Sequence, residues 1–232
     1  MSGFVSGLEP DDVGAILLSL KVAATATAVG LPLALLVAWA LARGRFPGRA
    51  LLDAVAHLPL VLPPVATGFA LLILFGRHGV IGAWLAQAGI VLSFRWTGAA
   101  LASVVMAFPL MVRPIRLSIE AIDREVDEAA RTLGAGAAMR FFRVTVPLAA
   151  PGLAAAAVLG FAKALGEFGA TITFVGAIPG ETLTLPTAIY QATQVPGAEP
   201  RALTLCAISA AIAVVAVLAS DLVSRRIAAA RS

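Results

Sequence analysis

The most unusual polar side chains in this sequence are Lys163 and Glu167, which lie one helical turn apart in an apolar stretch after Pro147. Charges inside a membrane are costly and usually face the interior of a helix bundle. The pair therefore has two interpretations of equal weight: a mutually neutralising pair that fixes helix packing, or part of a translocation path or gate. Thr171 and Thr173 follow within the sequence GATITFVG. Their hydroxyls could form brief hydrogen bonds to a solute without holding it.

The proline-rich segment of residues 57–68, HLPLVLPPVATG, is a second candidate for part of a path. Its prolines and its glycine must interrupt the backbone hydrogen bonds of a helix, and neighbouring helices must satisfy the freed groups. Unwound backbone of this kind can lie beside a path, which makes Thr67 a further candidate residue.

The sequence lacks the motifs of the common enzyme classes. A Walker A motif needs a lysine followed by Ser or Thr, whereas Lys21 precedes Val and Lys163 precedes Ala. His57 and His78 are the only histidines and Cys206 is the only cysteine, and no HExxH or GxSxG occurs. We therefore expect a chain that is not an enzyme, with no ATP hydrolysis of its own, no metal site and no cofactor.

The composition is that of an integral membrane protein. Hydrophobic residues make up 60% of the chain, charged residues 13%, and the mean hydropathy is +0.96. Soluble domains carry about 25% charged residues. The formal charge of +4 does not indicate nucleic-acid binding, because the arginines follow the membrane topology described below. The sequence predicts an all-α, polytopic helix bundle that forms one membrane domain.

The apolar segments predict about five membrane spans, since each is long enough to cross a bilayer. These segments are residues 13–42, 50–75, 97–117, 148–168 (or to 175 if the apolar run that follows belongs to the same span) and 202–223. Residues 76–96 have mixed character and are predicted to include a short helix along the surface, and residues 176–201 are predicted to be a loop. The membrane domain then covers residues 11–223, and residues 224–232 form a tail.

The arginines are distributed unequally between the two sides that these spans define. One side receives Arg43, Arg45, Arg49, Arg113, Arg116, Arg124, Arg131, Arg140, Arg143, Arg225, Arg226 and Arg231. The other side receives Arg77, Arg95 and Arg201, together with the acidic residues Glu9, Asp11 and Asp12. By the positive-inside rule, the N-terminus lies outside and the C-terminus inside. Residues 120–147, the most charged long segment, are then cytoplasmic.

Residues 120–147 have the pattern of two short helices separated by Gly134. Before the glycine, an apolar face at helical spacing contains Ile122, Val126, Ala129 and Leu133. Gly134 stands where this helix should stop, because the residue after a helix end favours a positive φ. A second helix is predicted over about residues 135–143, with Pro147 opening the next segment. Two short helices at a fixed angle make a rigid knob.

Opposite charges one turn apart are expected to add small stabilising contributions to the first of these helices. The predicted pairs are Glu120–Arg124, Arg124–Glu128 and Asp127–Arg131.

The same segment resembles the cytoplasmic EAA loop of bacterial ABC importer permeases. The family pattern is E-A-A, three residues, G, nine residues, then I-x-L-P. Here it is matched by Glu128, Ala129 and Ala130, then Gly134, then Val144 to Pro147, with Val in place of Ile and Leu. The resemblance implies that these residues couple the chain to a separate ATPase subunit. The alternative is an ordinary amphipathic helical linker at the membrane surface.

The chain as a whole is most similar to the molybdate permeases of this family. The matching segments are SLKV (19–22), FPGRALLD (46–53), HLPLVLPPV (57–65), FPLMVRPIR (108–116), EAARTLGAG (128–136) and LGEFGATITFVGAIPGET (165–182). The resemblance implies a type-1 ABC importer fold in the bacterial inner membrane and transport of molybdate, with tungstate not distinguished. It also implies three kinds of partner: a second copy of this chain, two ATPase subunits, and a periplasmic or lipid-tethered molybdate-binding protein. Two alternatives stay open: a permease for sulfate or another oxyanion, and a non-transporting membrane anchor or sensor.

Overall fold

The computed structural model describes residues 8–229, which form helices and their connections without any strand. The elements are α1 (Pro10–Arg43), α2 (Arg49–Val61), α3 (Pro64–Phe75), α4 (Gly82–Gln87), α5 (Trp96–Glu120), α6 (Arg124–Thr132), α7 (Ala137–Arg140), the π-helical turn η1 (Phe141–Thr145), α8 (Val146–Leu148), α9 (Ala150–Leu165), α10 (Gly169–Val175), α11 (Leu185–Thr193) and α12 (Glu199–Ala229). The prediction of an all-α helix bundle is confirmed.

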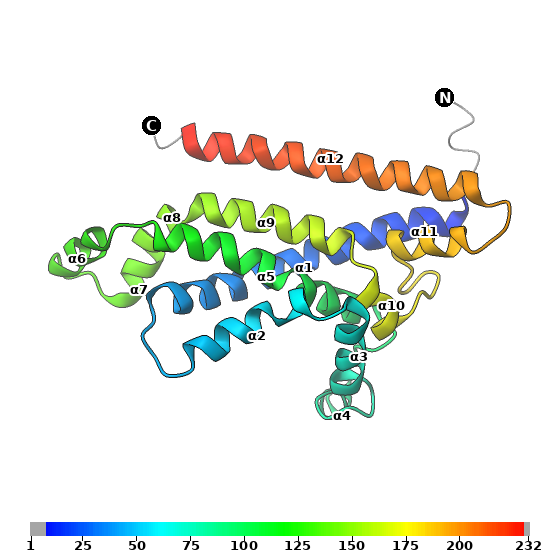
Figure 1. The fold of residues 1–232 in the computed structure, drawn as a ribbon, viewed down its shortest axis with the longest axis horizontal. Coiled ribbons are helices and arrows are strands. Elements are labelled where there is room, and N and C mark those ends of the chain that lie inside the picture. Colours follow the sequence, from blue (N-terminus) through cyan, green and yellow to red (C-terminus); the bar gives the residue numbers. More distant parts are fainter. Residues whose placement is uncertain (1–7, 230–232) are drawn as a thin grey trace.

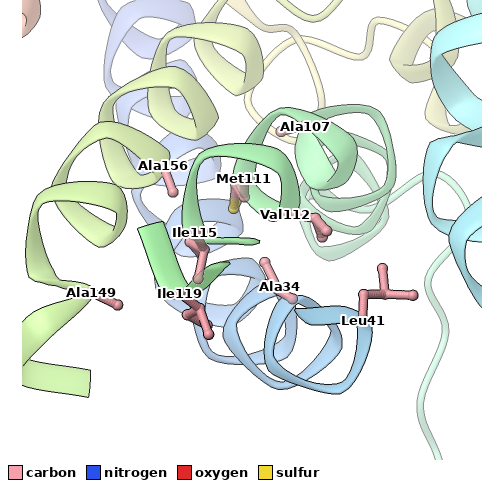
Figure 2. Packing of buried hydrophobic residues seen from close by; sticks show 10 residues of the cluster. Ala34, Leu41, Ala107, Met111, Val112, Ile115, Ile119, Ala149 and Ala156 are labelled. Atoms are coloured by element: carbon pink, nitrogen blue, oxygen red, sulfur yellow. The ribbon is translucent and has the colours of Figure 1, made fainter. Parts of the chain in front are cut away.

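The core of the bundle is formed by α1, α5 and α9, which run side by side (Figure 1). Small residues such as Ala34 and Ala156 let these helices approach closely, and larger side chains of α5 fill the space between them (Figure 2). Met111 is fully buried there. A Cβ added to Gly160 of α9 would lie 2.6 Å from the Cε of Met111, and a Cβ added to Gly30 of α1 would lie 3.0 Å from the same atom. Two glycines on opposite sides therefore make room for one methionine, as is common where membrane helices pack.

Within residues 8–229, three helices are long and apolar enough to cross a membrane, and the count rises to five if each of two bent pairs is one span. The three are α1, α5 and the first part of α12. One bent pair joins α2 to α3 at 118°, and the other joins residues 137–148 to α9 at 70°. The predicted five spans correspond to the upper count. The first bend falls at Leu62 and Pro63, inside the proline-rich segment where an interruption was expected.

Two segments differ from the sequence-based expectation. The fourth apolar segment is not one helix to residue 175, because α9 ends at Leu165 and α10 is a separate short helix. Residues 176–201 are not simply a loop, since they contain α11. The backbone N–H of Thr184 donates to the Thr187 hydroxyl (2.8 Å) at its start, and the N–H of Leu185 donates to Ser19 of α1 (2.6 Å). Pro186 is compatible with this helix because it lies in the first turn.

The two ends of the bundle differ in their elements. The short helices α6 and α7, which contain the EAA-like segment, lie at one end, together with the C-terminal end of α12 (Figure 1). At the other end, Arg201 of α12 pairs with Glu9 and with the fully buried carboxylate of Asp12, at 2.7 Å each. The distribution of arginines predicts that these three residues lie on the same, arginine-poor side of the membrane. The structure brings them into contact. The described part of the predicted tail, residues 224–229, continues α12, and residues 230–232 lie outside the described residues.

Candidate coupling loop and translocation path

Helix α6, the first helix of the candidate coupling loop, begins at a side-chain cap. The Asp123 carboxylate accepts a hydrogen bond from the N–H of Glu125 (3.1 Å), a common way to satisfy a free donor at a helix start. Glu120 belongs to α5, and the chain turns between the two helices. The predicted Glu120–Arg124 pair is therefore wrong, and Glu120 instead pairs with Arg116 of α5 at 2.9 Å.

The turn at Gly134 has the geometry that the sequence predicts. Gly134 has φ +84°, its N–H donates to Arg131 O (3.0 Å), and the N–H of Ala135 donates to Ala130 O (3.0 Å). These two bonds form a Schellman motif, which closes the helix and reverses the chain. The predicted helix stop is confirmed.

An ion pair across this turn holds α6 against α7. Arg140 Nε of α7 lies 3.1 Å from Asp127 Oδ1 of α6, and the same guanidinium also donates to Ala135 O (3.4 Å). Asp127 was predicted to pair with Arg131. Among the described residues it pairs with Arg140 instead, and the predicted Arg124–Glu128 pair is absent as well. The angle of the knob therefore depends on a contact between its two helices.

The second half of the loop is longer and less regular than predicted. α7 continues through η1 into α8, and the break comes at Ala149, so Pro147 lies inside a helical run and does not open the next segment. A proline ring clashes with the carbonyl four residues earlier in a regular helix. The widened π-helical turn at η1, which contains the half-buried Val144, accounts for the accommodation of Pro147. Such turns are frequent at functional sites.

The EAA residues, Glu128 to Ala130, lie on α6, a helix against which no other part of the described chain packs closely enough to bury a residue. Glu128 and Ala129 are exposed, Ala130 is half-buried, and α6 contains no fully buried residue. Three residues of the predicted apolar face are exposed as well: Ala129, Val126 at 44% and Leu133 at 88% exposure. The fourth, Ile122, lies before α6 and is half-buried against the core of the bundle, so it does not belong to this face. An amphipathic helix normally turns its apolar face toward a partner.

Lys163 and Glu167 are in contact, as their spacing predicts. The Lys163 ammonium pairs with Glu167 Oε2, and the other carboxylate oxygen accepts a hydrogen bond from the N–H of Ala170 (2.9 Å). Glu167 is 2% exposed and lies in the break after α9. The carboxylate therefore joins the end of α9 to the start of α10, a structural role that the sequence did not predict.

The remaining path candidates gather where α3 crosses α10. A Cβ added to Gly68 of α3 would lie 2.5 Å from Ala170 O and 2.9 Å from the Cβ of Thr173, both in α10. One added to Gly169 would lie 2.7 Å from the Cβ of Pro64. The two backbones therefore meet at glycines, and Thr67, which is 6% exposed, is next to this contact.

The hydroxyls of the three threonines differ in their hydrogen bonds. Thr173 donates to Gly169 O (2.8 Å), and Thr67 donates weakly to Pro63 O (3.5 Å). Thr171 is 1% exposed, and its hydroxyl has no hydrogen-bond partner within the part of the chain that the structure describes. A buried polar group of this kind is unusual and is costly to leave unsatisfied.

Arg43 forms a link that the sequence pattern did not predict. This last residue of α1 donates to Ile119 O (3.2 Å) and Ile122 O (2.9 Å) at the end of α5. Backbone carbonyls at a helix end have few partners within the helix, and Arg43 adds side-chain donors to two of them. The base of the candidate coupling loop is thereby attached to the end of α1.

The described chain is thus a bundle of long apolar helices with two short helices, α6 and α7, at one end. The chain belongs to the family of binding-protein-dependent transport system inner membrane components, whose model matches residues 30–229. It is accordingly a multi-pass protein of the inner membrane.

Relatives in this family are transport permeases. The chain is 54% identical to the molybdenum transport system permease protein ModB of Escherichia coli K12 over 212 residues, which cover 91% of this chain and 93% of the relative. It is 51% identical to ModB of Haemophilus influenzae, over 93% of this chain and 94% of the relative. The sulfate transport system permease protein CysT of Escherichia coli K12 is 43% identical, over 64% of this chain and 53% of the relative.

Solved structures show the same fold. A bacterial alginate ABC transporter matches with a TM-score of 0.77 at 21% identity, over 94% of this chain and 80% of the other. The MetNI methionine ABC transporter matches with a TM-score of 0.67 at 19% identity, over 93% of this chain and 94% of the other. The fold is that of type-1 ABC importer permeases.

Proposed function

We propose that this chain is the permease subunit of an ABC importer that carries molybdate, and tungstate with it, across the inner membrane. The observation that supports the permease role most strongly is the coupling loop, in which a rigid glycine turn presents an uncovered apolar helix face. The choice of ion rests on the relatives named as molybdenum permeases. ATP hydrolysis takes place on a separate ATPase subunit.

The knob of α6 and α7 transmits the motion of the ATPase. Leu133 and Val126 fill a groove on the ATPase, because their exposed apolar area has no cover within the described chain. The Asp127–Arg140 pair keeps the knob rigid, and Arg43 connects its base to α1 and α5. A displacement of the knob is thus passed to the bundle core.

The working assembly contains two copies of this chain, two ATPase subunits and a periplasmic or lipid-tethered molybdate-binding protein. The binding protein delivers the ion to the outer end, where Arg201 meets Glu9 and Asp12. The ATPases dock at the opposite end, which carries the coupling loop.

The α3–α10 crossing supplies the contacts for the ion in transit. Lys163 is neutralised by Glu167, so this lysine does not present a free positive charge that would trap a dianion. The Thr171 hydroxyl has no partner among the described residues and can form a short-lived hydrogen bond to an oxyanion. Thr67 and Thr173 are the neighbouring hydroxyls.

Thr171→Val tests this path. Valine has nearly the same shape and removes a hydroxyl without a partner in the described chain, so we expect thermal stability to be unchanged or slightly higher. Molybdate uptake is expected to fall several-fold. The control is Thr27→Val, because the Thr27 hydroxyl donates to Ala23 O within α1 and lies away from the crossing. Equal uptake in both variants would remove Thr171 from the path.

Competition for uptake tests the choice of ion. In the assembled transporter, unlabelled molybdate and tungstate should inhibit uptake of labelled molybdate at similar concentrations, and sulfate should be much weaker. Equal competition by sulfate would make the chain a general oxyanion or sulfate permease. No uptake of any oxyanion would favour the anchor or sensor alternative.

The orientation is tested with reporters that are active on one side of the membrane. Fusions after Arg49 and at the C-terminus are expected to report the cytoplasm, and a fusion after Gly180 the periplasm, because the arginines gather at the inner ends of the spans. A periplasmic signal after Arg49, or a cytoplasmic one after Gly180, would reverse the topology.

A further inference from the structure

A cavity of ≈ 410 Å³ lies between the last turn of α1 and the coupling helices. Its ionisable lining residues are Arg43, Arg45, Arg124, Arg140, Asp127 and Glu128. Four arginines against two carboxylates leave a formal net charge of +2. The cavity is thus suited to an anion.

Two of the four arginines are available to a ligand. Arg140 is held by Asp127 at 3.1 Å, and Arg43 donates to the carbonyls at the end of α5. Arg45 and Arg124 are exposed, and neither forms an ion pair within the described residues. Both line the cavity from different segments, Arg45 after α1 and Arg124 at the start of α6.

The other wall of the cavity is aromatic. Trp39 of α1 and Phe141 of η1 pack edge to face, with ring centroids 5.4 Å apart, and Trp39 keeps 39% of its surface exposed. Trp39 lies one turn before the end of a membrane-crossing helix, and tryptophans at such places sit at the level of the lipid headgroups. The cavity therefore lies where the bilayer meets the cytoplasm in the proposed orientation.

We propose that this cavity binds the phosphate group of an anionic phospholipid of the inner leaflet. Guanidinium groups match phosphate oxygens in geometry and charge, and basic pockets at the cytoplasmic ends of membrane helices bind acidic headgroups. The aromatic wall favours a lipid over free phosphate, because a free ion gains nothing from an apolar surface beside it. The bound headgroup would connect the end of α1 to the coupling knob.

Retention of phosphatidylglycerol by the full-length chain tests this site without requiring transport. Wild type and Arg45→Gln/Arg124→Gln are reconstituted in nanodiscs of phosphatidylcholine with phosphatidylglycerol, and bound lipid is measured by native mass spectrometry. Each arginine near an anionic lipid contributes about a factor of five. We expect about thirty-fold weaker retention in the double variant.

The control is Arg49→Gln/Arg131→Gln, which removes the same charge from exposed residues outside the cavity. It should retain phosphatidylglycerol like wild type. Equal loss in both double variants, or loss in neither, would overturn the proposal. If the test variant does not fold, Arg45→Gln alone should still weaken retention about five-fold, and no change would count against the site.

A competition arm separates lipid from a free ion. Inorganic phosphate should not displace phosphatidylglycerol from wild type. Displacement by phosphate, or equal retention of phosphatidylcholine, would identify a general anion site and overturn the assignment to an anionic lipid.

Discussion

Gly134→Val is expected to abolish ATP-driven uptake while the protein stays inserted and assembled. Gly134 has φ +84°, a conformation that is a genuine outlier for a β-branched residue. A Cβ at this position would meet nothing within 4 Å, so the penalty comes from the backbone alone. The cost is on the order of 1–2 kcal/mol, which is too small to unfold the bundle. It is enough to open the turn and misdirect the knob.

Gly136→Val is the matched control for this experiment. Gly136 has φ −65° and ψ 164°, which valine adopts readily, and a Cβ there also meets nothing within 4 Å. This variant should transport normally. Glu128→Ala should have a smaller effect than Gly134→Val, because it removes an exposed charge and leaves the backbone unchanged.

Three quantities are measured for each of these variants: co-purification of the ATPase, stimulated ATP hydrolysis and uptake. Wild-type values of all three in Gly134→Val would show that the loop does not transmit motion. Equal loss in Gly134→Val and Gly136→Val would point to the bulk of valine and not to the left-handed turn.

Gly68→Ala is expected to produce the second large effect, at the α3–α10 crossing. The added Cβ would lie 2.5 Å from Ala170 O, a backbone atom that cannot move without displacing α10. Overpacking of this kind costs about 1–3 kcal/mol. Because Thr67 and Thr173 border the contact, a shift of α10 also changes the proposed path, and uptake should fall more than the amount of folded protein does.

Gly14→Ala makes the same substitution in α1 where a Cβ meets nothing within 4 Å. It should be neutral or slightly stabilising, because alanine favours a helix over glycine. Thermal unfolding in detergent and uptake per folded protein are the two readouts. Equal stability and equal uptake in the two alanine variants would mean that the crossing is looser than the structure indicates.

The features that could be predicted from the sequence are those that depend on local patterns. The lengths of the apolar segments predict the membrane spans, since a helix must be long enough to cross the bilayer. The stop at Gly134 followed from the end of a helical pattern at a glycine. The contact between Lys163 and Glu167 followed from their spacing, and the interruption near Pro63 followed from backbone chemistry.

The features that were missed depend on contacts between distant residues. The Asp127–Arg140 pair spans 13 positions, and the Arg43 contacts to Ile119 and Ile122 span 76 and 79, so no helical period indicates them. The prolines of residues 176–201 indicate a loop, but this segment contains α11, whose first backbone N–H bonds to Ser19 of α1 at a separation of 166. Such contacts are set by the packing of the whole bundle.

The candidate path was predicted only in outline. Residue types indicated which hydroxyls and charges could face a solute. The sequence did not indicate that Gly68 and Gly169 bring α3 and α10 together, or that Thr171 alone of the three path threonines lacks a hydrogen-bond partner within the described chain. These facts depend on how a broken helix pair folds back against its neighbour.

Uptake of labelled molybdate into vesicles that contain this chain, its ATPase subunit and its binding protein is the most direct test of the proposed function. We predict ATP-dependent accumulation that needs all three components and is lost when any one is omitted. Accumulation without the ATPase, or none in the complete system while ATP hydrolysis proceeds, would contradict the assignment of this chain as the permease of a molybdate importer.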